Sequence, residues 1–250
     1  MNDSQGQDQL SEKVLRKLGQ LEQEIGRAVI GQRQVIRDVT IALLAGGHVL
    51  VEGVPGLGKT LLVRSLAAAV GGVFNRVQFT PDLMPSDISG HIMFDRKSDS
   101  FRVRKGPVFC NFLLADEINR APAKTQSAML EVMQEQQVTI EGQSFELNLP
   151  FLVLATQNSI EQEGTYPLPE AQLDRFMFNI LIDYPTHEDE VSIVKVTTAH
   201  KESKLNQVIS REEILKFQDL VRRVPVADNV IEYAVNLVSA TRPGENAQDF

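Results

Sequence analysis

The stretch that decides the fold is VEGVPGLGKT, residues 51–60, in which an apolar run breaks into glycines and a proline and ends on Lys59 and Thr60. It matches the pattern G-x-x-x-x-G-K-[ST] between a strand-like run, HVLVEG, and a helix-like apolar stripe. Strand, loop and helix in this order predict a loop whose backbone N–H groups and helix N-terminus hold phosphate oxygens. The predicted nucleotide-binding residues are Gly53, Val54, Pro55, Gly56, Leu57, Gly58, Lys59, Thr60 and Leu61.

Two side chains of this loop have distinct predicted roles. The Lys59 ammonium would reach the β- and γ-phosphates of ATP, and the Thr60 hydroxyl would ligate Mg²⁺. The competing interpretation is a glycine-rich turn that leaves a lysine in water. The flanking strand and helix patterns favour the phosphate site.

The second half of the site is predicted by NFLLADEINR, residues 111–120, where an apolar run delivers two carboxylates to its end. Parallel sheets bind their ligands at the carboxyl ends of the strands. We expect Asp116 to hold Mg²⁺ through water, and Glu117 to act as the base that orients and polarises the attacking water. An Asp-Glu pair alone is more often a solvated helix start, but the upstream phosphate loop reverses that preference.

Three further polar residues are weaker candidates. Asn158 follows the apolar run FLVLAT and could hold the attacking water or the γ-phosphate, or could simply form a turn. Arg175 precedes another apolar run and could stabilise the transferring phosphoryl group, or could pair with Asp174 or Glu170. Arg120 is a second, less favoured arginine. The four histidines lie far apart without metal-ligand spacing.

The wider pattern alternates strands with helices, which predicts an α/β fold with a mainly parallel central sheet flanked by helices. After Tyr184 the pattern becomes purely helical. We expect a frayed tail over residues 1–9, an α/β ATPase domain over 10–184, and a partial helical lid over 185–250. Predicted strands cover 48–53, 73–79, 111–116, 151–156 and 177–183, helices cover 10–28 and 32–44, and a projecting hairpin covers 136–150.

Composition limits the classes of partner. A formal net charge of -8 argues against binding driven by a general excess of positive charge, so nucleic acid is an unlikely partner. The single cysteine, Cys110, excludes an internal disulfide and lies in an apolar context that predicts burial. No apolar run is long enough to span a membrane, and the first residues lack a secretory-signal pattern. We expect a cytoplasmic protein without membrane insertion.

Several long blocks in the same order identify a family resemblance from about residue 20 onward. They are VIGQ (29–32), VEGVPGLGKT, QFTPDLMPSDISG (78–90), LLADEINRAPAKTQSAMLEVMQE (113–135) and LATQNSIEQEGTYPLPEAQLDRF (154–176). The chain resembles the MoxR family of AAA+ ATPases. The resemblance implies that Asn158 is the sensor 1 residue and that Arg175 is an arginine finger acting on a neighbouring subunit. It also places Ile30 and Gly31 near the adenine, an insertion at 79–94 and a pre-sensor hairpin at 136–150.

The resemblance implies a hexameric ring that uses Mg²⁺ and ATP to remodel or mature other proteins. A von Willebrand factor A domain protein is the implied partner, and metal or cofactor insertion is one implied task. Two departures stand out: Ser159 replaces the usual proline, and the chain ends before the segment that carries the sensor 2 arginine. Arg242 is too early to take that role. The lid is therefore expected to be incomplete.

Two other functions remain as alternatives. A nucleotide-binding switch with little hydrolysis would suit an incomplete lid, although such a protein does not need Glu117. A nucleic-acid motor would use the projecting hairpin, but residues 136–150 contain Glu141 and Glu146 and no lysine or arginine.

Overall fold

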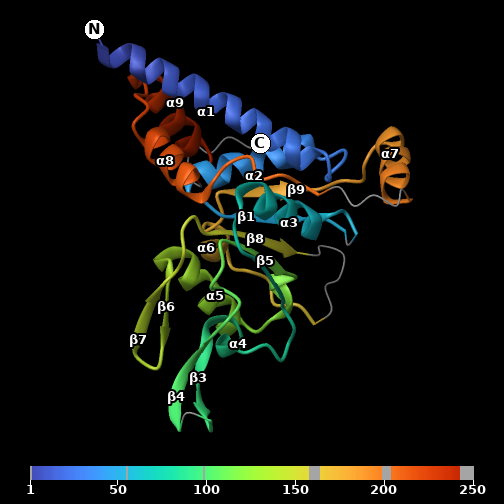
Figure 1. The fold of residues 1–250 in the computed structure, drawn as a ribbon, viewed down its shortest axis with the longest axis vertical. Coiled ribbons are helices and arrows are strands. Elements are labelled where there is room, and N and C mark those ends of the chain that lie inside the picture. The colour runs from blue at the N-terminus through green and yellow to red at the C-terminus, as the bar shows by residue number, and fades with distance from the viewer. Residues whose placement is uncertain (1, 55, 98, 158–163, 199–203, 243–250) are drawn as a thin grey trace.

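The fold is an α/β sandwich from which two hairpins project at one end (Figure 1). The computed structural model describes residues 2–54, 56–97, 99–157, 164–198 and 204–242. Its helices are α1 (Asn2–Gly26), α2 (Arg33–Ala45), α3 (Lys59–Val70), α4 (Pro85–Ser89), the 3-10 helix Ile118–Arg120, α5 (Ala123–Glu135), α6 (Glu170–Leu173), α7 (His187–Thr198), α8 (Arg211–Arg222) and α9 (Asp228–Ala240). Its strands are β1 (Val49–Glu52), β2 (Phe74–Gln78), β3 (Gly90–Asp95), β4 (Ser100–Lys105), β5 (Phe112–Asp116), β6 (Gln137–Ile140), β7 (Gln143–Glu146), β8 (Leu152–Gln157) and β9 (Phe178–Leu181).

The central sheet has five parallel strands in the order β2-β5-β8-β1-β9. This confirms the predicted fold class and all five predicted strands, with ends that shift by one or two residues. The strands are short apolar runs because both faces of the sheet are covered. Their carboxyl ends share one edge, which brings the ends of β1, β5 and β8 together.

Alternate side chains of each strand enter two separate cores. Val49 and Val51 of β1 face the core formed with α1, α2, α3 and α8, whereas Leu50 faces the core formed with α5. The strand period of two residues therefore decides which layer each side chain joins. Cys110 is buried in the second core, as predicted, and burial raises the pKa of its thiol to about 12.

The N-terminal helix starts earlier than the sequence predicts. α1 begins at Asn2, whereas the sequence predicts a helix from residue 10, and the frayed tail over residues 1–9 stays a prediction. Its apolar residues Val14, Leu21 and Ile25 recur at helical spacing and are buried. Once these contacts hold the C-terminal turns, each added residue extends an existing helix, which needs no further nucleation.

The sequence predicts one of the two hairpins and not the other. β6 and β7 form the hairpin predicted over 136–150, pairing Gln137 with Glu146 and Ile140 with Gln143. β3 and β4 form a second hairpin that the sequence reasoning missed, because its predicted insertion stopped at residue 94. This hairpin rests on Ile92 and Val103, which pack against the second core, a contact between distant segments that no local pattern reveals.

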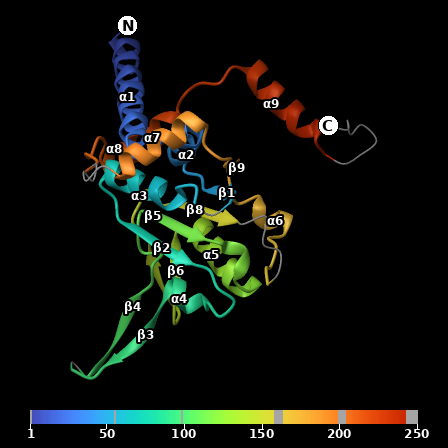
Figure 2. The ribbon, with the colours of Figure 1, turned by 90° about the vertical axis from the view of Figure 1, so that its right-hand side faces the viewer.

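The helices after β9 differ in how they contact the body. α8 buries Ile214 and Phe217 in the first core, and a capping box between Ser210 and Glu213 opens the helix, with both of its hydrogen bonds present. α7 and α9 bury none of their described side chains, and α9 lies apart from the sheet (Figure 2). The division into domains at residue 184 stays a prediction. None of the described helices combines the length and the apolar character needed to cross a lipid bilayer.

Candidate nucleotide site

The predicted phosphate loop joins the end of β1 to the start of α3. Lys59 is the first residue of α3, and its ammonium donates a hydrogen bond to the Gly53 carbonyl across the loop at 2.6 Å. Gly58 precedes the helix with φ of 78°, a backbone conformation that side chains disfavour. At Gly53 a Cβ would lie 2.6 Å from the Ile182 carbonyl oxygen. Both glycines are therefore required by the shape of the loop.

A cavity of about 390 Å³ opens beside this loop. It is lined by Lys59 and Thr60 from the loop side and by Asp116 and Glu117 from the end of β5. The structure thus brings together four side chains that the sequence assigned to one site from two separate motifs. The positive end of α3 faces the same space, which suits an anionic ligand.

Burial lowers the pKa of the Lys59 ammonium, while the negative charges of Asp116 and Glu117 oppose that shift. The lysine is thus a partly desolvated cation close to two carboxylates. Phosphate groups in the cavity would raise the pKa of Lys59 and keep it protonated, because an adjacent anion favours the charged form.

A threonine from β8, Thr156, binds both carboxylate residues and fixes their positions. The Thr156 hydroxyl donates to Asp116 Oδ1 at 2.6 Å and accepts from the Glu117 backbone N–H at 2.8 Å. Glu117 itself has φ of 56° and ψ of 50°, in the left-handed region that non-glycine residues seldom adopt. Such strain persists where surrounding contacts fix it, and it is concentrated at functional sites.

Two side chains of β2 bind these carboxylates from the other side. The Arg76 guanidinium donates to Asp116 Oδ2 from Nη2 at 2.6 Å and from Nε at 3.1 Å. Gln78 accepts from Arg76 at 2.8 Å and donates to Glu117 Oε2 at 2.8 Å. Arg120 lies 3.3 Å from the same Glu117 oxygen. A polar chain therefore runs from Asp116 through β2 to Glu117.

Thr156, Arg76 and Gln78 all line the cavity, and the sequence reasoning did not select them. The sequence held a weak signal for Thr156, which is the one polar residue of the apolar run FLVLAT (151–156). Arg76 and Gln78 alternate around Val77 and so share a face of β2. That this face turns toward β5 depends on the strand order, which pairs Gln78 with Asp116.

A second cavity of about 220 Å³ lies on the other side of the loop. Gly56, Gly58 and Leu61 line both cavities, so the loop is their common wall. The second cavity is more apolar and adds Leu57, Ile30 and Val29 with residues of α7. Gly31, also predicted near the adenine, does not line it: a Cβ there would lie 3.0 Å from the Asp189 side chain. Gly31 permits close packing of α7.

Of the remaining predicted residues, those that the structure describes do not line the polar cavity. Arg175 lies exposed in the turn before β9, outside the lining of both cavities, and forms no ion pair with Asp174 or Glu170, which the structure also describes. Pro55, Asn158 and the unusual Ser159 lie outside the described residues. Val54 is partly buried in the loop without lining either cavity.

The donor set fits a magnesium ion. Mg²⁺ is usually held by one or two protein oxygens together with phosphates and waters, and the Thr60 hydroxyl and the Asp116 carboxylate line the same cavity as Lys59. Both are hard oxygen ligands. The two cavities, one polar and one apolar, likewise suit the phosphates and the base of a nucleotide.

Comparison with known proteins agrees with this geometry. Residues 48–178 match the family model described as "ATPase family associated with various cellular activities (AAA)". The chain is 49% identical to Chaperone MoxR1 of Mycobacterium tuberculosis over 89% of its own length, and spans 59% of that relative. It is 46% identical to the uncharacterized protein YeaC of Bacillus subtilis, covering 92% of this chain and 72% of YeaC.

A solved structure shows the same fold. The crystal structure of a candidate ATPase from Cytophaga hutchinsonii superposes with a TM-score of 0.85 at 45% identity, covering 94% of this chain and 72% of the other. Sequence identity, the family model and the fold thus point to one group. The chain belongs to the MoxR-type AAA ATPases.

Proposed function

We propose that this chain binds Mg-ATP between the phosphate loop and the end of β5 and hydrolyses it to ADP and phosphate. The observation that carries the proposal is one cavity lined by Lys59, Thr60, Asp116 and Glu117. The cation and the loop N–H groups would bind the phosphates, and Thr60 and Asp116 would hold Mg²⁺. The metal, when bound, neutralises charge on the phosphate oxygens.

Glu117 is the proposed general base. Its carboxylate ends in the cavity, and its strained backbone is held by Thr156. From there it would orient a water and accept its proton as the water attacks the γ-phosphate. Asn158 is proposed to assist in positioning that water. A nucleotide switch without hydrolysis would have no use for a carboxylate held in this way.

Replacing Lys59 by alanine tests the site. We expect Lys59→Ala to weaken Mg-ATP binding at least about tenfold, because a partly buried cation within the phosphate site is lost. Binding of a fluorescent ATP analogue measures this directly. Lys124→Ala, which removes an exposed lysine of α5, is the matched control and should bind normally. Equal affinities for wild type and Lys59→Ala, with both folded, would place the nucleotide elsewhere.

Arg76 should compete with magnesium for Asp116. The guanidinium already binds Asp116 Oδ2, so a metal-bound water at that oxygen must displace it. We expect Arg76→Gln to lower the Mg²⁺ concentration needed for half-maximal ATP binding several-fold. The exposure of Arg76 keeps the expected effect modest. A Mg²⁺ titration of analogue fluorescence measures it, with Arg37→Gln as the control. A higher Mg²⁺ requirement in Arg76→Gln would mean that Arg76 helps to form the metal site.

We further propose that the ATPase acts as a hexameric ring that remodels or matures other proteins in the cytoplasm. The name of the relative Chaperone MoxR1 supports a role on protein clients. Support for a ring comes from Arg175, which is exposed and outside its own cavities, as expected for an arginine that acts on a neighbour. A von Willebrand factor A domain partner and a task in metal or cofactor insertion rest on the family resemblance alone.

A further inference from the structure

The hairpin of β3 and β4 extends away from both cores and ends far from the sheet (Figure 2). Its register places Ile92 opposite Val103 and Phe94 opposite Phe101 on one face. Ile92 and Val103 pack against the second core. Phe94 and Phe101 continue the same apolar stripe beyond the body of the protein, where their side chains are 48% and 75% exposed.

This aromatic pair is an unusual surface feature. The two rings contact edge to face, with centroids 5.3 Å apart and an angle of 64° between the planes. Exposed aromatic side chains that are held by a neighbour lose little entropy on binding, which makes them good anchors for a partner. The pair is therefore a preformed apolar contact site near the end of the hairpin.

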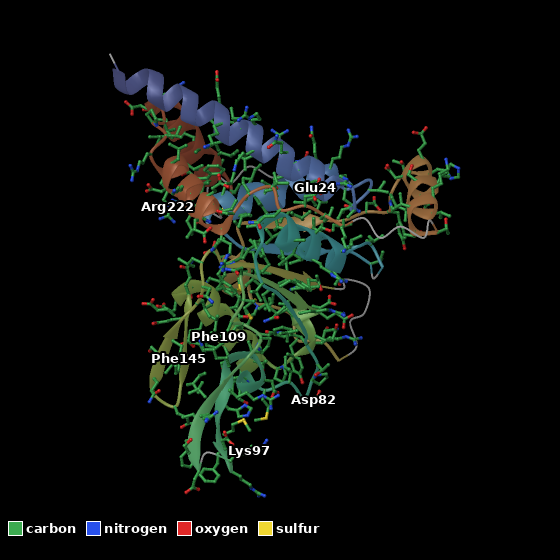
Figure 3. The ribbon with its side chains drawn as sticks, in the orientation of Figure 1. Glu24, Asp82, Lys97, Phe109, Phe145 and Arg222 are labelled. Atoms are coloured by element: carbon green, nitrogen blue, oxygen red, sulfur yellow. The ribbon has the colours of Figure 1, made fainter. Side chains whose placement is uncertain are left out.

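The opposite face of the hairpin is cationic. Arg104 lies opposite His91. Arg102 lies opposite Met93 and forms an ion pair with Asp95 on the same face, with 3.3 Å between Nε and Oδ2. Lys97 stands at the far end of the hairpin (Figure 3). Residues 90–105 hold five Lys or Arg against two Asp, in a chain whose net charge is -8. The hairpin therefore concentrates positive charge on an otherwise acidic protein, on the face opposite an exposed apolar stripe.

The base of the hairpin is tightly fixed. At Gly90 a Cβ would lie 2.2 Å from the Arg104 carbonyl oxygen, so the strands approach closely there. Lys105 lies over the ring of Phe109 at 4.7 Å, and Phe109 contacts Phe145 of the β6-β7 hairpin edge to face at 6.5 Å. Figure 3 labels both residues beside the β6-β7 hairpin, above the β3-β4 hairpin. The exposed end is thus presented on a rigid support.

We propose that the β3-β4 hairpin binds an extended, acidic segment of a client polypeptide that also carries apolar side chains. Carboxylates of the segment would pair with Arg104 and would share Arg102 with Asp95, its partner in the hairpin, and apolar side chains would contact Phe94 and Phe101. In the described part of the chain, each of the two strands has one edge without a strand neighbour, which an extended peptide can use for main-chain hydrogen bonds. This inference rests on the proposed function as a remodeller of proteins.

A nucleic acid fits this surface less well. Single strands stack successive bases on open aromatic faces, and the edge-to-face contact of Phe94 and Phe101 covers part of the ring surface that stacking would use. A phosphate backbone carries a charge at every nucleotide and would also meet the neighbouring β6-β7 hairpin, which carries Glu141 and Glu146. A peptide can place its carboxylates against the arginines alone.

The test uses the whole chain and three fluorescein-labelled probes: a 12-residue peptide of alternating Asp and Leu, its Lys-Leu counterpart, and a 20-nucleotide thymidine strand. Fluorescence anisotropy measures their binding. We expect the Asp-Leu peptide to bind most tightly. Arg102→Gln/Arg104→Gln should weaken that binding about threefold to tenfold, and Phe94→Ser/Phe101→Ser at least about fivefold. Arg16→Gln/Arg37→Gln removes the same charge from α1 and α2, away from the hairpin, and should bind normally.

Two results would overturn the proposal. In the first, the Lys-Leu peptide or the thymidine strand binds more tightly than the Asp-Leu peptide. In the second, the affinity for the Asp-Leu peptide is unchanged in both hairpin variants. Circular dichroism should show that the variants fold like the wild type, as we expect because all four replaced hairpin side chains are exposed and lie outside both cores. ATP-analogue binding and phosphate release on the same samples test the proposed ATPase separately. Peptide binding without ATP turnover would contradict the proposed ATP hydrolysis and would still support peptide binding at the hairpin.

Discussion

Glu117→Gln is expected to reduce the rate of ATP hydrolysis by about 10²-fold to 10⁴-fold while leaving Mg-ATP affinity within a few-fold of wild type. The amide is nearly isosteric with the carboxylate but accepts no proton from the attacking water. Asp116, Thr60 and Lys59 keep their places, because Thr156 holds the Glu117 backbone through its N–H and not through the carboxylate. The variant should therefore accumulate bound ATP.

Phosphate release under steady-state conditions and retention of radiolabelled ATP measure these two quantities. Glu131→Gln makes the same chemical change on the exposed surface of α5 and should behave as wild type. Glu117→Gln should also weaken the contacts that Gln78 and Arg120 make with this side chain, because the negative charge of the carboxylate is lost. If Glu117→Gln turns over ATP at the wild-type rate, another group is the base, and the strained backbone at this position has a structural origin.

Arg175→Ala is expected to lower ATP turnover by about 10³-fold or more, since an arginine finger stabilises the charge that develops on the transferring phosphoryl group. Nucleotide affinity should change little, because Arg175 lies outside both cavities of its own chain. The wild-type rate per subunit should rise with protein concentration as subunits assemble, whereas the rate of Arg175→Ala should stay low at every concentration. Arg37→Ala, on the exposed surface of α2, is the matched control.

Mixing two inactive variants decides whether Arg175 acts between subunits. Lys59→Ala keeps the arginine but loses its own phosphate site, and Arg175→Ala keeps the site but loses the arginine. In a ring, a Lys59→Ala subunit can supply the arginine to the intact site of an Arg175→Ala neighbour. The mixture should therefore recover a measurable part of the wild-type rate. Loss of activity in Arg175→Ala with no recovery on mixing would mean that the arginine acts within its own subunit.

The sequence by itself determined the class of fold and the residues that we propose for the site. The loop at 53–60 is recognisable because its function needs glycines, a lysine and a hydroxyl at fixed spacing within one turn of backbone. Asp116 and Glu117 are recognisable because a short apolar strand ends on them. Five buried strands separated by helical patterns then specify a parallel sheet, since each strand is covered on both faces. These signals are local, so the chain displays them directly.

The tertiary structure alone decided which polar residues surround the carboxylates and which side chains of the β3-β4 hairpin are exposed. Arg76 and Gln78 lie at Asp116 and Glu117 because β2 pairs with β5, and Thr156 joins them because β8 lies on the other side of β5. Those neighbours come from segments about 40 residues apart, and strand order is set by packing over the whole sheet. The exposure of Phe94 and Phe101 likewise depends on where the core ends, which no pattern along the chain records.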